Sequence, residues 1–168
     1  MTLEKTYLDS VIKKMTAYKD LGEKTFEQLE ESDFHFSPNE ESNSIAIIVQ
    51  HISGNMLSRW TNFLAEDGEK EWRQRDDEFE VHQFSKQQII DVWEKGWQCL
   101  FTCLQSLNDE DLMKTITIRK EAMPVIDAIN RQLAHYPYHI GQIIYIGKIL
   151  KNQEWKNLSV PKKKVKSN

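Results

Sequence analysis

Two histidines in the last third of the chain have the spacing of metal ligands. His135 and His139 are four residues apart, so on a helix both imidazole rings lie on one face and can bind a single ion. Zinc and similar divalent metals accept neutral imidazole nitrogen, and a catalytic site commonly has three protein ligands plus water. His51, in the middle of another apolar segment, is the best candidate for the third ligand. Spacing alone leaves a plainer interpretation open, in which these are ordinary polar side chains of a helix.

Three other polar residues are candidates for the surroundings of this site. Asn55 follows His51 by one helical turn, and Gln142 follows His139 by three positions, so either side chain could orient a ligand ring. Both could equally satisfy nearby backbone groups. Arg59 could attract an acidic thiol, although an ordinary salt bridge explains it as well. No Ser-His-Asp order or paired-carboxylate motif stands out, so a metal-free hydrolase has little support and the catalytic residues are unknown.

Four segments with helical periodicity must position these residues. Their apolar residues recur at three- to five-residue spacing, which is the period of a helix that buries one face. The expected helices span residues 2–31, 44–65, 85–107 and 123–150. Ser85 and Gln88 form a capping-box pattern at the start of the third helix, and Pro124 suits the start of the fourth. We therefore expect an all-α fold of four helices.

The segments around the helices add further expectations. Residues 66–79 form a long charged connection with a turn-forming Asp-Gly pair, which indicates a role at a site or an interface. Residues 115–118 alternate polar and apolar side chains, as a short extended segment does. Pro137 should bend the fourth helix, because proline lacks the amide that the preceding turn requires. That helix is apolar around most of its circumference, so it is either central or part of an oligomer contact.

Composition and charge exclude several classes of protein. The chain has 168 residues and a net charge of −4, and the four lysines in its last seven residues leave about −8 on the rest. Such an acidic domain repels nucleic-acid phosphate, so we expect no nucleic-acid partner. No apolar run is long enough to span a membrane, and no secretory signal is visible, so we expect a cytoplasmic protein. Residues 1–160 should form one domain, followed by a basic flexible tail at 161–168.

The two cysteines, Cys99 and Cys103, fall four residues apart within one expected helix. A chain with two cysteines and no signal peptide is rarely held together by disulfides. We expect two buried, reduced thiols that pack as small hydrophobic groups. A redox pair or a pair of soft metal ligands is the alternative.

Two stretches resemble the DinB/YfiT-like family of metal-binding proteins. They are residues 43–60, NSIAIIVQHISGNMLSRW, and residues 135–142, HYPYHIGQ, and the charged segment 67–76 resembles an uncharacterised subgroup. The likeness extends over nearly the whole chain. It implies an up-down-down-up four-helix bundle, commonly dimeric, whose metal is bound by one histidine of the second helix and two of the fourth. Those positions match His51, His135 and His139.

The resemblance also implies a class of reaction. Characterised relatives include transferases and isomerases that use low-molecular-weight thiols, so the leading hypothesis is a metal-dependent thiol S-transferase that detoxifies electrophiles. The same ion could instead activate water, which makes a hydrolase the second choice. Zinc and nickel are the expected metals, because imidazole sites bind whichever late divalent ion is available. The alternative of another class is a non-enzymatic, dimeric, stress-related binding module with a structural or vestigial metal site.

Overall fold

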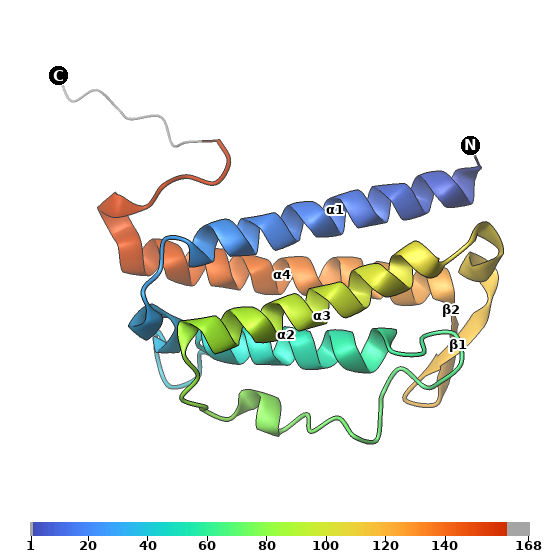
Figure 1. The fold of residues 1–168 in the computed structure, drawn as a ribbon, viewed down its shortest axis with the longest axis horizontal. Helices are drawn as coiled ribbons and strands as arrows, with labels where there is room; N and C mark the ends of the chain where they lie inside the picture. The colour runs from blue at the N-terminus through green and yellow to red at the C-terminus, as the bar shows by residue number, and fades with distance from the viewer. Residues whose placement is uncertain (1, 161–168) are drawn as a thin grey trace.

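The computed structural model describes residues 2–160, in which four helices lie side by side and a small two-stranded sheet lies at one end (Figure 1). The helices are α1 (Leu3–Phe26), α2 (Ile45–Trp60), α3 (Lys86–Ser106) and α4 (Val125–Lys151). The strands are β1 (Thr115–Ile118) and β2 (Glu121–Pro124). Four short 3-10 helices, η1 (Glu31–His35), η2 (Asp77–Phe79), η3 (Asp109–Met113) and η4 (Asn152–Glu154), lie in the connections and after α4. The chain is mostly helical, as predicted; the predicted basic tail, 161–168, lies outside the described residues.

The starts of the helices follow the capping residues, whereas two predicted ends are too late. The predicted capping box of Ser85 and Gln88 is present at the start of α3. The first helix ends at Phe26 instead of near residue 31, because η1 has its own capping box. The second ends at Trp60 instead of residue 65, since the backbone becomes extended at Thr61 and left-handed at Asn62, a residue type that tolerates this conformation. Hydrophobic periodicity cannot detect either event.

A β-hairpin precedes the fourth helix, which begins at Val125, close to the start predicted at Met123 and Pro124. The extended segment 115–118 is present as β1, and it pairs antiparallel with β2, which the sequence analysis missed. Arg119 and Lys120 form the turn, both with positive φ, at 56° and 66°. Residues other than glycine and asparagine rarely adopt this backbone conformation, so the turn needs support from other contacts. The Asp67 carboxylate supplies it by accepting hydrogen bonds from both turn amides, at 2.9 and 2.8 Å.

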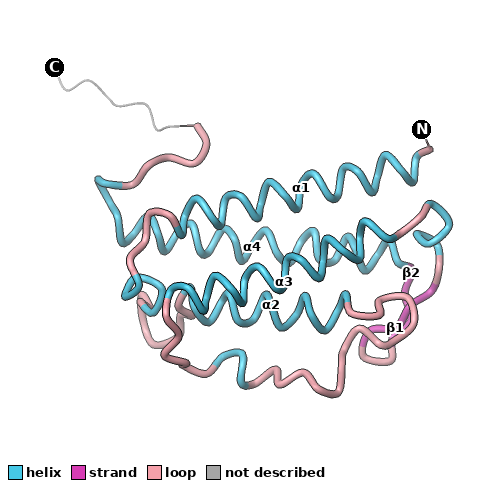
Figure 2. Tube along the Cα trace, in the orientation of Figure 1, coloured by secondary structure: helices cyan, strands magenta, loops and turns pink. Residues whose placement is uncertain are grey.

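The charged connection between α2 and α3 is a structural part of the bundle. After α2 ends beside the hairpin, residues 61–85 run back along the length of α2 to reach the start of α3 (Figure 2). Its 3-10 turn η2 packs against α2. Polar contacts fix its first part, since the Ser58 hydroxyl donates to the carbonyl of Gly68 and accepts from the amide of Lys70. This path brings charged side chains of the connection over the middle of α2.

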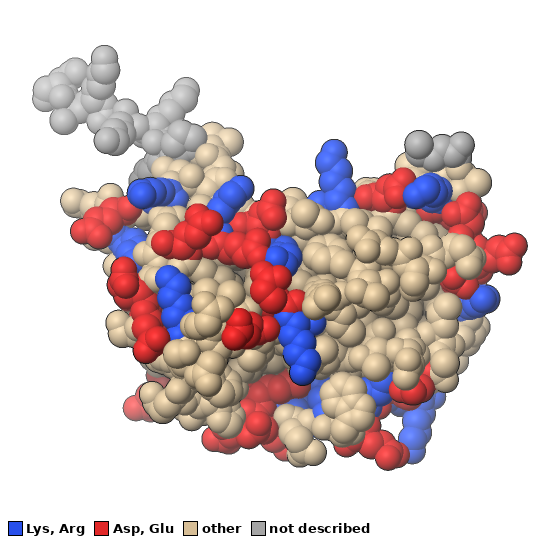
Figure 3. All heavy atoms as spheres, viewed as in Figure 1, with Lys and Arg blue, Asp and Glu red and all other residues tan. Residues whose placement is uncertain are grey.

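The core and the surface divide as expected for a helical domain. Trp93 and Trp97 of α3 are fully buried, and α2 and α3 approach so closely that a Cβ on Gly96 would lie 2.9 Å from the Cα of Ser53. Acidic and basic side chains are interspersed on the face seen in Figure 3.

Within residues 2–160, no helix combines the length and the apolar character that crossing a bilayer requires. Helix α4 continues without interruption through Pro137.

Candidate metal centre

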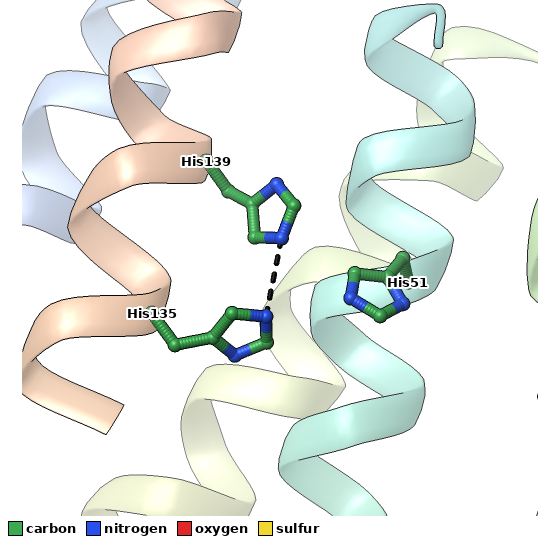
Figure 4. A group of neighbouring side chains, drawn as sticks. All are labelled: His51, His135 and His139. Carbon is green, nitrogen blue, oxygen red and sulfur yellow. Dashed lines mark hydrogen bonds between the residues drawn. The ribbon is translucent and has the colours of Figure 1, made fainter. Parts of the chain in front are cut away.

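Three histidines from two helices point toward one another in the interior of the bundle (Figure 4). His51 comes from the middle of α2, and His135 and His139 come from successive turns of α4. One ligand nitrogen from each ring lies within 4.8 Å of the others. The Nε2 atoms of His135 and His139 are 3.2 Å apart. The imidazoles that the sequence analysis grouped are therefore adjacent in space.

Each ring nitrogen that faces away from the cluster has an oxygen partner. His51 Nδ1 lies 3.0 Å from Glu78 Oε2, His135 Nδ1 lies 3.1 Å from Gln132 Oε1, and His139 Nδ1 lies 2.8 Å from Gln142 Oε1. An oxygen acceptor at Nδ1 places the ring proton there and leaves the Nε2 lone pair free. All three rings are thereby held in the tautomer that presents Nε2 to the centre of the cluster.

These distances fit a divalent ion. Two imidazole nitrogens bound tetrahedrally at about 2.0–2.1 Å from a metal are separated by about 3.3 Å, which is close to the 3.2 Å between His135 and His139. Two Nε2 lone pairs at that distance repel each other unless a cation or a proton lies between them. His51 is the more distant ring, with its centroid 5.5 Å from that of His135 and 5.1 Å from that of His139. The residues present therefore suit a site with three nitrogen ligands.

Burial keeps the two α4 ligands neutral. It lowers the pKa of His135 to about 3, with smaller contributions from the neighbouring His139, His51 and two arginines. Burial likewise lowers the pKa of His139 to about 4, against the opposing hydrogen bond to Gln142. Neutral imidazole is the form that binds a metal ion. Both rings are therefore available as ligands at neutral pH without the removal of a proton.

Glu78 links the connection between α2 and α3 to the histidine cluster. Its carboxylate accepts two hydrogen bonds from Arg73, at 2.7 and 2.8 Å, in addition to its contact with His51. Burial alone would raise the pKa of Glu78, but Arg73, and then His51, hold it below its usual range. Gly54 gives this carboxylate its space, because a Cβ there would lie 2.6 Å from the Glu78 Cδ. A buried ion pair thus orients the His51 ring.

The three polar residues that were predicted to lie around the site occupy different positions. Gln142 contacts a ligand ring, as described above. Asn55 accepts a hydrogen bond from the Tyr136 hydroxyl at 3.0 Å. It makes no hydrogen bond to the three histidines, but it lines a polar pocket beside them. Arg59 is 2% exposed, and its guanidinium donates to the carbonyl of Gly68 and lies 3.4 Å from a carboxylate oxygen of Glu69. It ties the connection to α2.

A pocket of about 270 Å³ opens beside the histidines. Its wall includes His51 and His135, together with Asn55, Gln132 and Tyr138, and the rest of the wall consists of arginine side chains. Among residues 2–160, the histidine cluster has no fourth His, Cys, Asp or Glu member. The geometry therefore combines three nitrogen ligands with a polar cavity that reaches two of them.

Sequence reasoning missed several residues of this region. Gln132 precedes His135 by three positions, just as Gln142 follows His139 by three, so the same helical spacing could have identified it. Glu78 and Arg73 lie in the long charged connection between α2 and α3, but no local sequence pattern pairs them with His51. Their contacts arise only because the connection folds back along α2.

The cysteines lie apart from the histidines. Cys99 and Cys103 are free thiols on α3 that pack against the core, as predicted, but they are only half-buried because they line a shallow groove at the surface between α2 and α3. Burial, with a smaller contribution from Cys99, raises the pKa of the Cys103 thiol to about 12. A thiol with so high a pKa is a poor nucleophile. Neither cysteine belongs to the histidine cluster.

Fold and site together define a helical domain with a three-histidine cluster able to hold a metal ion. The model of a family described as proteins of unknown function, DUF1572, matches residues 2–164, and the chain belongs to that family. No curated protein and no solved structure matches the chain.

Proposed function

We propose that this protein is a metal-dependent enzyme that binds one divalent ion, zinc or nickel, through His51, His135 and His139, and transfers a low-molecular-weight thiol to an electrophile. The observation that carries the proposal is the convergence of three Nε2 atoms beside an accessible polar pocket. A structural metal site is normally closed by a fourth protein ligand, whereas a catalytic site keeps a position open. Three imidazoles next to a cavity have the second arrangement.

Each group of residues at the site would have a separate role in the proposed reaction. An ion held at the three nitrogens would supply a Lewis acid that lowers the pKa of a thiol or water placed against it. Glu78, Gln132 and Gln142 fix the ligand rings through their Nδ1 atoms. The pocket admits substrate from the side of His51 and His135. The buried α4 ligands need no deprotonation to act at neutral pH.

We further propose that the protein is a DinB/YfiT-like bundle with up-down-down-up topology. The colour gradients in Figure 1 support this, because α1 and α4 run in one direction and α2 and α3 in the other. A cytoplasmic homodimer is part of the same proposal. Exposed apolar side chains on α4 support a dimer, with Tyr138, Tyr145 and Ile149 exposed by 52%, 66% and 45%. Their spacing places them on one side of the helix.

Metal content and thiol-dependent turnover test the proposal together. The purified full chain should retain close to one divalent ion, and His135→Ala or His139→Ala should each lower occupancy sharply. The protein loaded with zinc or with nickel is then screened against small thiols paired with model electrophiles, and against esters without thiol. Thiol-dependent turnover that is lost in His139→Ala supports the transferase. Ester hydrolysis alone would establish a hydrolase, and absence of turnover with either metal would favour the non-enzymatic binding module.

A further inference from the structure

Every arginine of this chain lines the pocket beside the histidines. The sequence has five arginines and seventeen lysines. The five arginines are Arg59, Arg73, Arg75, Arg119 and Arg131. They come from α2, the charged connection, the hairpin turn and α4, so four separate segments deliver the same residue type to one cavity. No lysine of residues 2–160 lines the pocket, so its positive charge comes from arginine alone within the described part of the chain.

The carboxylates around this pocket neutralise only part of the charge. Glu69 contacts Arg59, Arg73 and Arg119, at 3.4, 3.3 and 3.2 Å, and Glu78 contacts Arg73. Among the described residues, Arg75 and Arg131 form no ion pair. Five guanidinium groups against two carboxylates leave three positive charges in excess, within a domain whose overall charge is negative. Such a concentration of like charge is unfavourable unless a bound anion neutralises it.

Arg59 gives a second, independent sign of a missing partner. Its Nε atom is buried and has no hydrogen-bond partner among the described residues. An unsatisfied buried donor of a charged group is costly, so an occupant that accepts this hydrogen bond would be favoured. Burial lowers the pKa of Arg59, and the neighbouring Arg131 and Arg73 lower it further despite the opposing charge of Glu69. The positive charge of the neighbouring arginines therefore disfavours the charged form of Arg59.

We infer that this pocket binds a small molecule carrying two or more carboxylate or phosphate groups, with its reacting end at the histidine cluster. This assigns a substrate class to the proposed active site and therefore rests on the proposed function. The planar guanidinium group matches carboxylate and phosphate oxygens in pairs, which the lysine ammonium group does not. The volume of about 270 Å³ is near the lower end of small-molecule pockets, so the ligand is the size of a small metabolite.

The anion site can be tested without the metal, which separates this inference from the proposed function. The metal-free full chain is titrated by calorimetry with succinate, with inorganic phosphate, and with succinamide as the uncharged match for succinate. At least one anion should bind about tenfold or more tightly than succinamide, and the tighter of the two identifies the preferred group. Anion binding without metal uptake or turnover would leave the inference standing and reject the proposed enzyme.

Arg131→Gln and Arg75→Gln provide the matched variants, because neither side chain forms an ion pair that holds the fold together. Each should weaken binding of the preferred anion about five- to tenfold. Lys148→Gln on the same helix as Arg131 is the control, since Lys148 is exposed and does not line the pocket, and it should bind as the unmodified chain does. Binding no tighter than succinamide, or equal losses in Arg131→Gln and Lys148→Gln, would overturn the inference.

Discussion

Replacing Gly54 with alanine should weaken metal binding although it changes no metal ligand. A Cβ at this position of α2 would lie 2.1 Å from the Oε1 and 2.6 Å from the Cδ of Glu78, and ordinary contact begins at 3.4 Å, so the carboxyl group must retreat by about 1.3 Å. The bond from Glu78 to His51 Nδ1 is 3.0 Å long. A retreat of that size takes it beyond hydrogen-bond range and releases the orientation of the His51 ring.

The expected loss of metal affinity follows from the loss of the hydrogen bond between Glu78 and His51. Loss of such a hydrogen bond typically lowers metal affinity about 10- to 100-fold, or about 1.4–2.7 kcal/mol. Alanine at a helical glycine gains about 1 kcal/mol of helix propensity, which offsets much of the local strain. The Gly54→Ala protein should therefore remain folded, with unfolding free energy within about 1 kcal/mol of the unmodified chain, and lose affinity selectively.

The assay is a zinc competition titration against a chromophoric chelator, with urea unfolding as the measure of stability. Gly141→Ala is the control, because Gly141 lies on α4 between His139 and Gln142 and a Cβ there meets nothing within 4 Å. It should leave zinc affinity unchanged. Equal zinc affinity in Gly54→Ala and the unmodified chain would refute the role of Glu78 in holding His51.

Three further predictions follow from the structure. Burial alone would raise the pKa of Asp67, but three backbone amides outweigh it and lower the pKa to about 2; this stabilisation is present above pH 4 and is lost as the pH falls from about 4 to 2. Asp67→Asn should therefore be about 1 kcal/mol less stable in urea unfolding at pH 7, after allowance for solvent screening, and nearly equal to the unmodified chain at pH 2. The chain should sediment as a dimer at micromolar concentration, and Tyr145→Lys should convert it to a monomer if α4 forms the contact; a monomeric unmodified chain would contradict this. Because burial raises the pKa of Cys103 to about 12, its alkylation at pH 8 should be at least about a hundredfold slower in the native protein than in urea, and comparable rates would show that the thiol is accessible and ionised.

Local sequence signals predicted the parts of the fold that depend on neighbouring residues. The start of α3 was correct because Ser85 and Gln88 satisfy each other's backbone amides within one turn. The strand β2 was missed because its pairing with β1 needs a turn at Arg119 and Lys120 that their residue types do not favour, and the distant Asp67 carboxylate supports that turn. The end of α2 was placed too late because the left-handed residue Asn62 is invisible to hydrophobic periodicity.

The same distinction separates the predictable from the unpredictable parts of the site. His135 and His139 are related by helical spacing, so their proximity could be read directly from the sequence. Placing His51 beside them needed a second helix and was strengthened by a family resemblance. Arg59 was a candidate because it lies on the same helix as His51. Glu78 and the arginines of the connection and the hairpin turn could not be found in this way, because the paths of those segments depend on tertiary contacts. A count of arginines against lysines, however, would have shown how sparingly this chain uses arginine.

X-ray absorption spectroscopy of the protein loaded with one equivalent of zinc tests the central claim most directly, because it reports the number and type of ligand atoms around the ion. Three imidazole nitrogens at about 2.0–2.1 Å, completed by a light atom from solvent, are predicted. A sulfur ligand at about 2.3 Å, or fewer than three imidazoles, would show that the ion is bound somewhere other than at the three histidines.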